Sequence, residues 1–189
     1  SDFNLIEEYL IKNQKIKNNG KLIKFLVDEY LSRSEVEKSC KILSNINYPT
    51  DDTYLSKFHI YCLINDDKRE EAQLQFDLKT ELGFKDVFFE KKFNYLMEYD
   101  TSIDETISEK NILNFHLSHR TNPNFVFEPN NSTDKKIWRY LSTSNLLTNI
   151  ENVDLEDRKK ILSIEKATHE GNYTENELFE LYKRFQFNI

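Results

Sequence analysis

The scarcity of glycine and proline restricts the fold of this chain more than any other feature of its sequence. Only 3 glycines and 3 prolines occur among the 189 residues. All-β domains need these residues at frequent intervals, because glycine supplies positive φ angles at turns and proline presets the geometry of turns. The sequence therefore predicts an all-α protein.

Apolar side chains recur at helical spacing along most of the chain, which favours the same fold class. Two segments begin with the capping-box spacing of a hydroxyl residue and a glutamate, at Ser34 with Glu37 and at Thr174 with Glu177. Gly83 follows a periodic segment, as C′ glycines do. We predict helices over residues 2–13, 20–33, 34–46, 49–65, 67–83, 85–99, 107–117, 134–145, 155–171 and 174–187.

Two prolines mark the one long irregular loop that we predict, at 119–133. Pro123 and Pro129 lack a backbone N–H and push the residue before them away from helical angles. The other connections are expected to span about two to six residues. The loop would separate an N-terminal helical-hairpin stack at 1–118 from C-terminal hairpins at 134–189, within one continuous domain. Because the sequence opens with Ser1, we expect a fragment of a longer protein.

Composition and charge limit the classes of partner. The net charge is -7, and this disfavours a dedicated nucleic-acid binder, which usually carries a basic face. One basic stretch, 12–24, has five lysines and no acid. It would contact anionic lipid or RNA, or form a solvated loop, which is the interpretation we favour.

Hydrophobic content of 38% with 13% aromatic residues predicts a core built from a few large rings.

A small residue followed four positions later by a large apolar one occurs at Ala72 and Phe76. Ser39 and Leu43 show the same relation, and Ser39 precedes Ala72 by 33 residues. This pattern resembles the second helix of a tetratricopeptide repeat, a family with a period of about 34 residues. In that family the small residue lets two helices approach closely, and the ring fills the groove between helix pairs.

The resemblance covers about half of the chain and departs from the family in three places. Ile60 and His59 stand where the family has a glycine and an aromatic residue, Lys79 replaces a small residue, and residues 99–149 do not keep the period. The resemblance implies antiparallel helical hairpins stacked as a short α-solenoid. It also implies a protein or peptide partner on a concave face, whose identity the sequence does not give.

The isolated glycines argue against an enzyme. Gly20, Gly83 and Gly171 stand far apart, so no glycine-rich phosphate loop and no nucleophile elbow exists in the sequence. Nucleotide-dependent enzymes and α/β-hydrolases need these glycines for close backbone approach. We therefore predict no enzymatic activity and no cofactor.

Histidine and cysteine spacing gives one alternative. His59 with Cys62, and His116 with His119, are each three residues apart and would share a helix face. Together they would supply three nitrogens and one sulfur to a zinc ion in a small metal-binding or enzymatic domain. We favour no metal, because Cys62 lies on an apolar stripe and no carboxylate flanks the His116–His119 pair to orient it.

Candidate residues for a protein partner lie in and beside the predicted loop. Phe125 and Phe127 fall in an extended stretch between the prolines, Arg120 ends the helix before it, and Trp138 follows in the next helix. We expect Trp138 to anchor the loop by packing, as buried rings beside long loops usually do.

The sequence leaves the cellular compartment open. Cys40 and Cys62 are either free buried thiols or one disulfide. No apolar run is long enough to span a bilayer, so we expect a soluble protein of the cytoplasm or the periplasm, depending on any upstream segment. The function predicted from the sequence is a non-catalytic protein-interaction or scaffold module of a larger protein.

Overall fold

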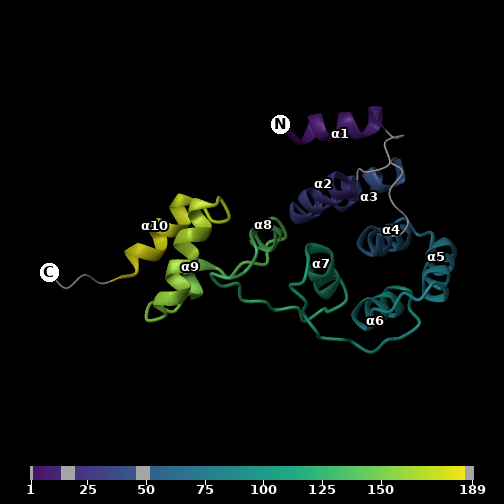
Figure 1. Ribbon diagram of the computed structural model, residues 1–189. Coiled ribbons are helices and arrows are strands. Elements are labelled where there is room, and N and C mark those ends of the chain that lie inside the picture. The colour runs from purple at the N-terminus through teal and green to yellow at the C-terminus, as the bar shows by residue number, and fades with distance from the viewer. Residues whose placement is uncertain (1, 14–19, 46–51, 186–189) are drawn as a thin grey trace. The chain divides into compact units, whose positions relative to one another are not determined.

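The structure is a computed structural model that describes residues 2–13, 20–45 and 52–185. These ranges contain ten α-helices and one 3₁₀ helix and no β-strand (Figure 1), which confirms the all-α class. The elements are α1 (Asp2–Lys12), α2 (Gly20–Ser32), α3 (Val36–Asn45), α4 (Thr53–Asn65), α5 (Arg69–Glu81), α6 (Val87–Leu96), α7 (Ile112–Arg120), α8 (Lys135–Thr143), η1 (Ile150–Asn152), α9 (Arg158–His169) and α10 (Glu175–Lys183).

The chain divides into two compact units. The first consists of Ser1–Leu31 and Glu35–Phe125, and the second of Ser32–Ser34 and Val126–Ile189. In the first unit, α4 packs against α3, α5 and α6, and α6 also packs against α7. In the second unit, α10 packs against η1 and α9. The division between the units falls inside the loop that the sequence predicts at 119–133.

Large aromatic rings fill the core of the first unit, in agreement with the composition. Phe58, Phe89, Phe93 and Phe115 are each at most 1% exposed. Phe76 of α5 stacks on Phe93 of α6 with ring centroids 4.2 Å apart. Since each ring buries much apolar area, a chain with few aliphatic residues still forms a packed interior.

The second unit has its own smaller core, in which Trp138 of α8 lies among aliphatic side chains from η1, α9 and α10. The Arg184 guanidinium donates to the backbone oxygens of Ile150 (2.6 Å) and Val153 (2.8 Å) beside this core. The buried members of this core are Trp138, Ile150, Val153, Ile161, Ile164, Ala167, Tyr173 and Leu181.

Most of the helices that end in a left-handed residue lack the glycine that usually serves this purpose. Six helices place a residue of positive φ at C′, and the next N–H bonds back to the carbonyl five residues earlier, as in a Schellman motif. Gly83 and Gly171 occupy two of these positions, which confirms the prediction for Gly83. The other four are held by non-glycine residues: Ser34, Asp67, Glu98 and Asn145.

This use of Ser34 makes the sequence prediction of a capping box there wrong. Ser34 has φ 61°, and the N–H of Glu35 bonds to the Tyr30 oxygen at 3.0 Å, so Ser34 ends α2. Helix α3 begins two residues later, at Val36. The capping box predicted at Thr174 is confirmed, because the Thr174 hydroxyl and the Glu177 carboxylate bond reciprocally to backbone N–H groups.

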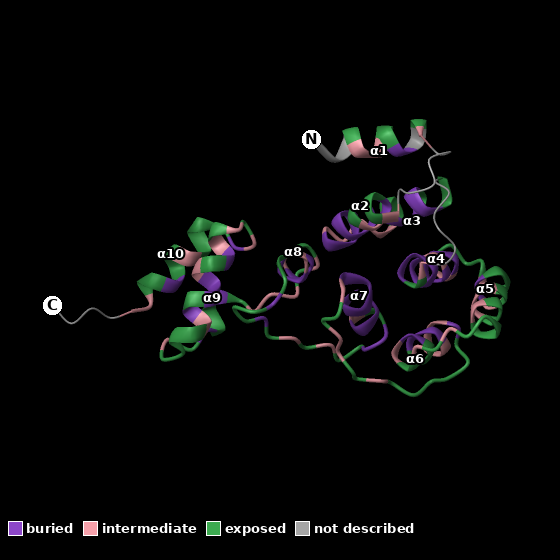
Figure 2. Ribbon diagram, viewed as in Figure 1, coloured by how far each residue is buried: buried purple, intermediate pink, exposed green. Residues whose placement is uncertain are grey.

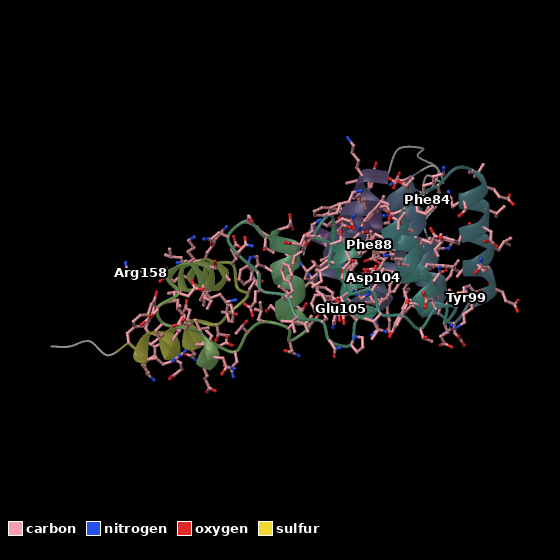
Figure 3. The ribbon with its side chains drawn as sticks, turned by 90° about the horizontal axis from the view of Figure 1, so that it is seen from below. Phe84, Phe88, Tyr99, Asp104, Glu105 and Arg158 are labelled. Atoms are coloured by element: carbon pink, nitrogen blue, oxygen red, sulfur yellow. A yellow bond between two sulfur atoms is a disulfide. The ribbon has the colours of Figure 1, made fainter. Side chains whose placement is uncertain are left out.

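The prediction of short connections is wrong between α6 and α7, where no helix forms from 97 to 111. Helix α7 starts at Ile112 and not at residue 107, with Asn111 as its N-cap. Two aspartates, Asp100 and Asp104, accept bonds from N–H groups two residues ahead, and such local bonds compete with helix formation. Asp104 and Tyr99 of this segment are labelled in Figure 3.

A buried lysine of α6 bonds to this irregular segment. Lys92 of α6 is 0% exposed, and its ammonium donates to the backbone oxygen of Asp104. The Asp104 carboxylate lies 3.9 Å from the same nitrogen. Burial lowers the pKa of Lys92, and the Asp104 charge acts in the opposite direction. No apolar periodicity indicates this contact, because it depends on one charged side chain.

The positive φ angles lead to a paired stability prediction. Gly83 has φ 90° with open space where a Cβ would lie, so Gly83→Ala should lower the free energy of unfolding by about 1 kcal/mol through backbone strain alone. Asp67 has φ 59°, and Asp67→Gly should raise it by about 0.5 kcal/mol, because relief of strain exceeds the added freedom of the unfolded chain. Urea denaturation measures both; changes of the same sign would contradict this explanation.

Candidate interaction surface

Three exposed leucines form a row along the outer side of α5. Leu74, Leu78 and Leu82 are 57%, 44% and 82% exposed, whereas Ala72 of the same helix is fully buried. Successive residues turn by about 100° around a helix, so residues four apart differ by only about 40°. The three side chains therefore share one face, which we call the α5 leucine row. Figure 2 shows the contrast between this largely exposed helix and the buried α4.

Four carboxylates of α5 lie around the leucine row. Glu70, Glu71, Asp77 and Glu81 are exposed and lie within about 100° of Leu78 around the helix axis. We call these four carboxylates the α5 acidic flank.

The two basic residues of α5 are Arg69, on the side opposite Leu78, and Lys79, about 100° from Leu78. Arg69 donates to the Leu96 backbone oxygen (3.3 Å) and to the Glu98 carboxylate (2.9 Å), both at the end of α6. Lys79 lines a pocket together with residues of α4. The outer face of α5 therefore combines an apolar row with four carboxylates and one partly buried lysine, an excess of negative charge.

A pocket of about 350 Å³ lies where the α5 leucine row ends. Leu82 belongs to both the row and the pocket wall, so the two are continuous. Lys57 in its wall is paired, since its ammonium lies 2.8 Å from the Asp86 carboxylate at the N-cap of α6. That ammonium lowers the pKa of Asp86 against the opposing effect of burial. The lining residues are Thr53, Ser56, Lys57, Ile60, Lys79, Leu82, Gly83 and Phe84.

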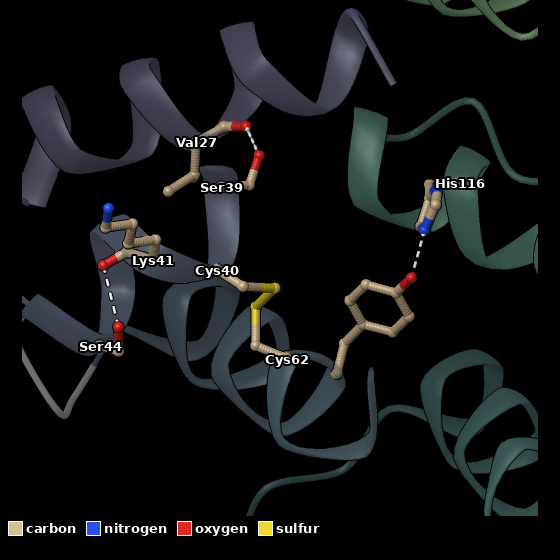
Figure 4. The surroundings of a disulfide bond; sticks show 8 residues. Val27, Ser39, Cys40, Lys41, Ser44, Cys62 and His116 are labelled. Atoms are coloured by element: carbon tan, nitrogen blue, oxygen red, sulfur yellow. Dashed lines mark hydrogen bonds between the residues drawn. A yellow bond between two sulfur atoms is a disulfide. The ribbon is translucent and has the colours of Figure 1, made fainter. Parts of the chain in front are cut away.

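His116 lies in the interior and holds two helices together. Its Nε2 is 2.6 Å from the hydroxyl of Tyr61 on α4, and the two rings meet edge to face at 5.0 Å (Figure 4). The side chain is 2% exposed. Burial, followed by the charge of Arg120, lowers the pKa of His116 to about 3. The imidazole is therefore neutral at physiological pH and suited to a structural bond.

Phe125, His119 and Arg120 lie at the C-terminal end of α7, close to the bonded pair of His116 and Tyr61. Phe125 lies edge to face against Phe115 with centroids 5.5 Å apart, and 5.1 Å from the His119 ring. Burial raises the pKa of Tyr61, and the charge and hydrogen bond of Arg120 partly offset that rise. Phe125 is half-buried, so the ring that the sequence marked for a partner is largely engaged within its own unit.

A disulfide joins Cys40 of α3 to Cys62 of α4 (Figure 4), with Cα atoms 5.3 Å apart. This pairing resolves the two possibilities left by the sequence. It also makes the alternative of a zinc site wrong as formulated, because the bonded Cys62 sulfur cannot act as a thiolate ligand. Among the described residues, no group of three or more histidine, cysteine or acidic side chains is placed to hold a metal ion.

The remaining candidates lie in the second unit. Phe127 is half-buried, while Val126 before it is 75% exposed. Trp138 is 5% exposed, and its indole N–H donates to the Asn130 backbone oxygen at 3.3 Å. The tryptophan thus fastens the end of the loop to α8 in addition to filling the core.

The basic stretch 12–24 falls partly outside the described residues, which omit 14–19. Within the described part, the Lys24 ammonium lies 4.3 Å from the centre of the Tyr54 ring, and this contact occupies one of its lysines. Among the described residues, no helix combines the length and apolar character needed to cross a bilayer.

Sequence reasoning missed the α5 surface, although its signal was present. Residues 67–83 carry two apolar stripes, one through Ala72 and Phe76 and a second through the three leucines. A helix with a single buried face needs only the first stripe. The second stripe indicates a further apolar face on the helix, although periodicity alone does not show which of the two faces is covered.

Comparison of the chain with protein-family models, curated proteins and solved structures finds no match.

Proposed function

We propose that this chain is a non-catalytic protein-interaction or scaffold module, built from tetratricopeptide-like helical hairpins that stack as a short α-solenoid. The α5 leucine row is the observation that carries the proposal. The three side chains are large, apolar and at least 44% exposed. Covering them with another surface would remove this apolar area from water, which favours association. Such rows are typical of surfaces that bind a helix or peptide.

The buried small residues support the repeat hypothesis. Ser39 of α3 and Ala72 of α5 stand 33 residues apart and are both fully buried. The Ser39 hydroxyl donates to the Val27 oxygen of α2 at 3.0 Å, so α3 approaches α2 closely at this residue. This is the role that a small residue has at the second-helix position of a tetratricopeptide repeat.

The buried polar groups support a structural rather than a catalytic role. His116 bonds to Tyr61, Lys57 pairs with Asp86, and the Tyr54 hydroxyl donates to the Asp28 carboxylate. Each pair joins two different helices. Catalytic groups usually face a cavity that admits substrate. Lys57 lines a pocket, but its ammonium is paired with Asp86, and the other groups bond to each other between helices.

The disulfide favours an oxidising compartment. Bonds of this kind persist in the periplasm or outside the cell and are rare in the cytoplasm. Of the two compartments that the sequence left open, we therefore propose the periplasm or an equivalent oxidising space. Alkylation of free thiols in intact cells should leave Cys40 and Cys62 unlabelled until a reductant is added; labelling without reductant would contradict this assignment.

The function is tested by the dependence of partner capture on the leucine row. Tagged protein from its source organism should retain a stoichiometric partner, and the triple variant Leu74→Ser, Leu78→Ser, Leu82→Ser should lose it. All three side chains are exposed, so the variant should fold as the wild type does. Leu162→Ser on α9 is the control, because Leu162 is similarly exposed at 56%. Capture that survives the triple substitution would contradict the proposal.

A further inference from the structure

We infer that the α5 surface, formed by the leucine row and the acidic flank, binds a cationic amphipathic helix of a partner protein. This inference rests on the proposed function and specifies the class of partner. Two features of the surface determine that class: the spacing of its apolar side chains and the sign of its charge.

The spacing fits a helix. Leu74, Leu78 and Leu82 rise along α5 in steps of one turn, about 6 Å each. A partner helix laid against this face presents apolar side chains at the same interval when they recur every three or four residues. The pocket at Leu82 adds a deeper position, walled by Ile60 and Phe84, for one larger apolar side chain of the partner.

The charge fits a basic partner. Glu70, Glu71, Asp77 and Glu81 lie around the row, while Arg69 is engaged with the end of α6 and Lys79 faces the pocket. Lysine or arginine beside the apolar positions of a partner helix would meet these carboxylates at the rim of the contact. Such rim pairs speed association and select the partner more than they add affinity.

The same charge argues against two other occupants. A second copy of this chain would place its own acidic flank against the first, and the net charge of -7 adds to that repulsion. An anionic membrane surface would be repelled for the same reason. A basic helix is the occupant whose charge and periodicity both complement the surface.

The test uses a labelled 14-residue peptide that repeats Leu-Lys-Lys-Leu-Leu-Lys-Leu twice, with fluorescence anisotropy as the readout. The full chain should bind the peptide, and raising NaCl from about 50 to 300 mM should weaken binding, since exposed charges are screened. The triple leucine-to-serine variant should bind at least about tenfold more weakly. Amide substitution of the acidic flank, at Glu70, Glu71, Asp77 and Glu81, should remove most of the salt dependence.

A matched control separates this surface from the acidity of the whole chain. Amide substitution at four exposed glutamates elsewhere makes the same change in net charge and should leave binding close to that of the wild type. These positions are Glu37, Glu105, Glu109 and Glu156. Equal loss in the two amide variants would show binding to net charge alone and overturn the inference, as would unchanged binding of the triple leucine variant.

Two further outcomes would also overturn it. Leucine-dependent binding to phosphatidylglycerol vesicles in place of the peptide would assign the surface to a membrane, and leucine-dependent dimerisation in sedimentation would assign it to a second copy. Failure of the peptide, with partner capture from cells still dependent on the leucine row, would leave the proposed function standing and reject only the cationic helix.

Discussion

Removing the disulfide between Cys40 and Cys62 is expected to lower the free energy of unfolding by about 3 kcal/mol. The two cysteines are 22 residues apart in the sequence. A cross-link over a loop of this length removes chain entropy from the unfolded state, and the chain-entropy model gives about 3 kcal/mol for it. Both residues are at most 5% exposed, so the bond lies within the packed contact between α3 and α4.

The measurement is urea denaturation of the oxidised chain and of the double variant Cys40→Ser, Cys62→Ser at pH 7. Adding a reductant to the wild type should shift its midpoint toward that of the variant, and it should leave the variant unchanged. A loss of stability below about 1 kcal/mol would show that the disulfide contributes little, against the entropy estimate.

Lowering the pH is the second change that is expected to reduce the free energy of unfolding strongly, and His116 is the main source of this loss. The folded-state pKa of about 3 lies below the value of 6.5 for an unperturbed histidine, because burial disfavours the imidazolium. The folded state therefore binds fewer protons than the unfolded state between these values. The stability contributed by neutral His116 is fully present above pH 6.5 and is lost as the pH falls toward 3. Between pH 7 and pH 5 the expected loss is about 2 kcal/mol.

The variant His116→Gln isolates this contribution. Glutamine does not titrate and can still hydrogen-bond the Tyr61 hydroxyl, so its stability should fall by about 2 kcal/mol less than that of the wild type between pH 7 and pH 5. Burial also lowers the pKa values of the partly exposed His59 and His119, so some acid sensitivity should remain in the variant. If the stability of His116→Gln fell between pH 7 and pH 5 as much as that of the wild type, His116 would not be the source of the acid sensitivity.

The parts of the fold that follow from local patterns could be predicted from the sequence. The all-α class follows from the scarcity of turn residues, and the Thr174–Glu177 capping box depends only on residues three apart. Gly83 ends α5 as expected because glycine adopts positive φ without strain. Each of these features is decided by neighbours in the sequence, which explains why it was visible there.

The features that depend on contacts between distant residues were out of reach. The segment 97–111 stays irregular beside buried Lys92, and Ser34 ends one helix instead of starting the next. The disulfide likewise depends on how α3 and α4 pack. At the candidate site, the histidine spacing suggested ligands, but His116 turned out to be committed to Tyr61. Periodicity alone does not state which of two apolar stripes on α5 is covered, so the exposed row required the structure.

Photo-crosslinking in living cells tests most directly whether the α5 surface is where this protein meets its partner. Benzoylphenylalanine at position 78 should yield a defined adduct with one protein on illumination, because Leu78 lies at the middle of the leucine row. Benzoylphenylalanine at position 162, which is similarly exposed on α9, should yield no adduct. An adduct that forms at 162 and not at 78, or equally at both, would contradict the account.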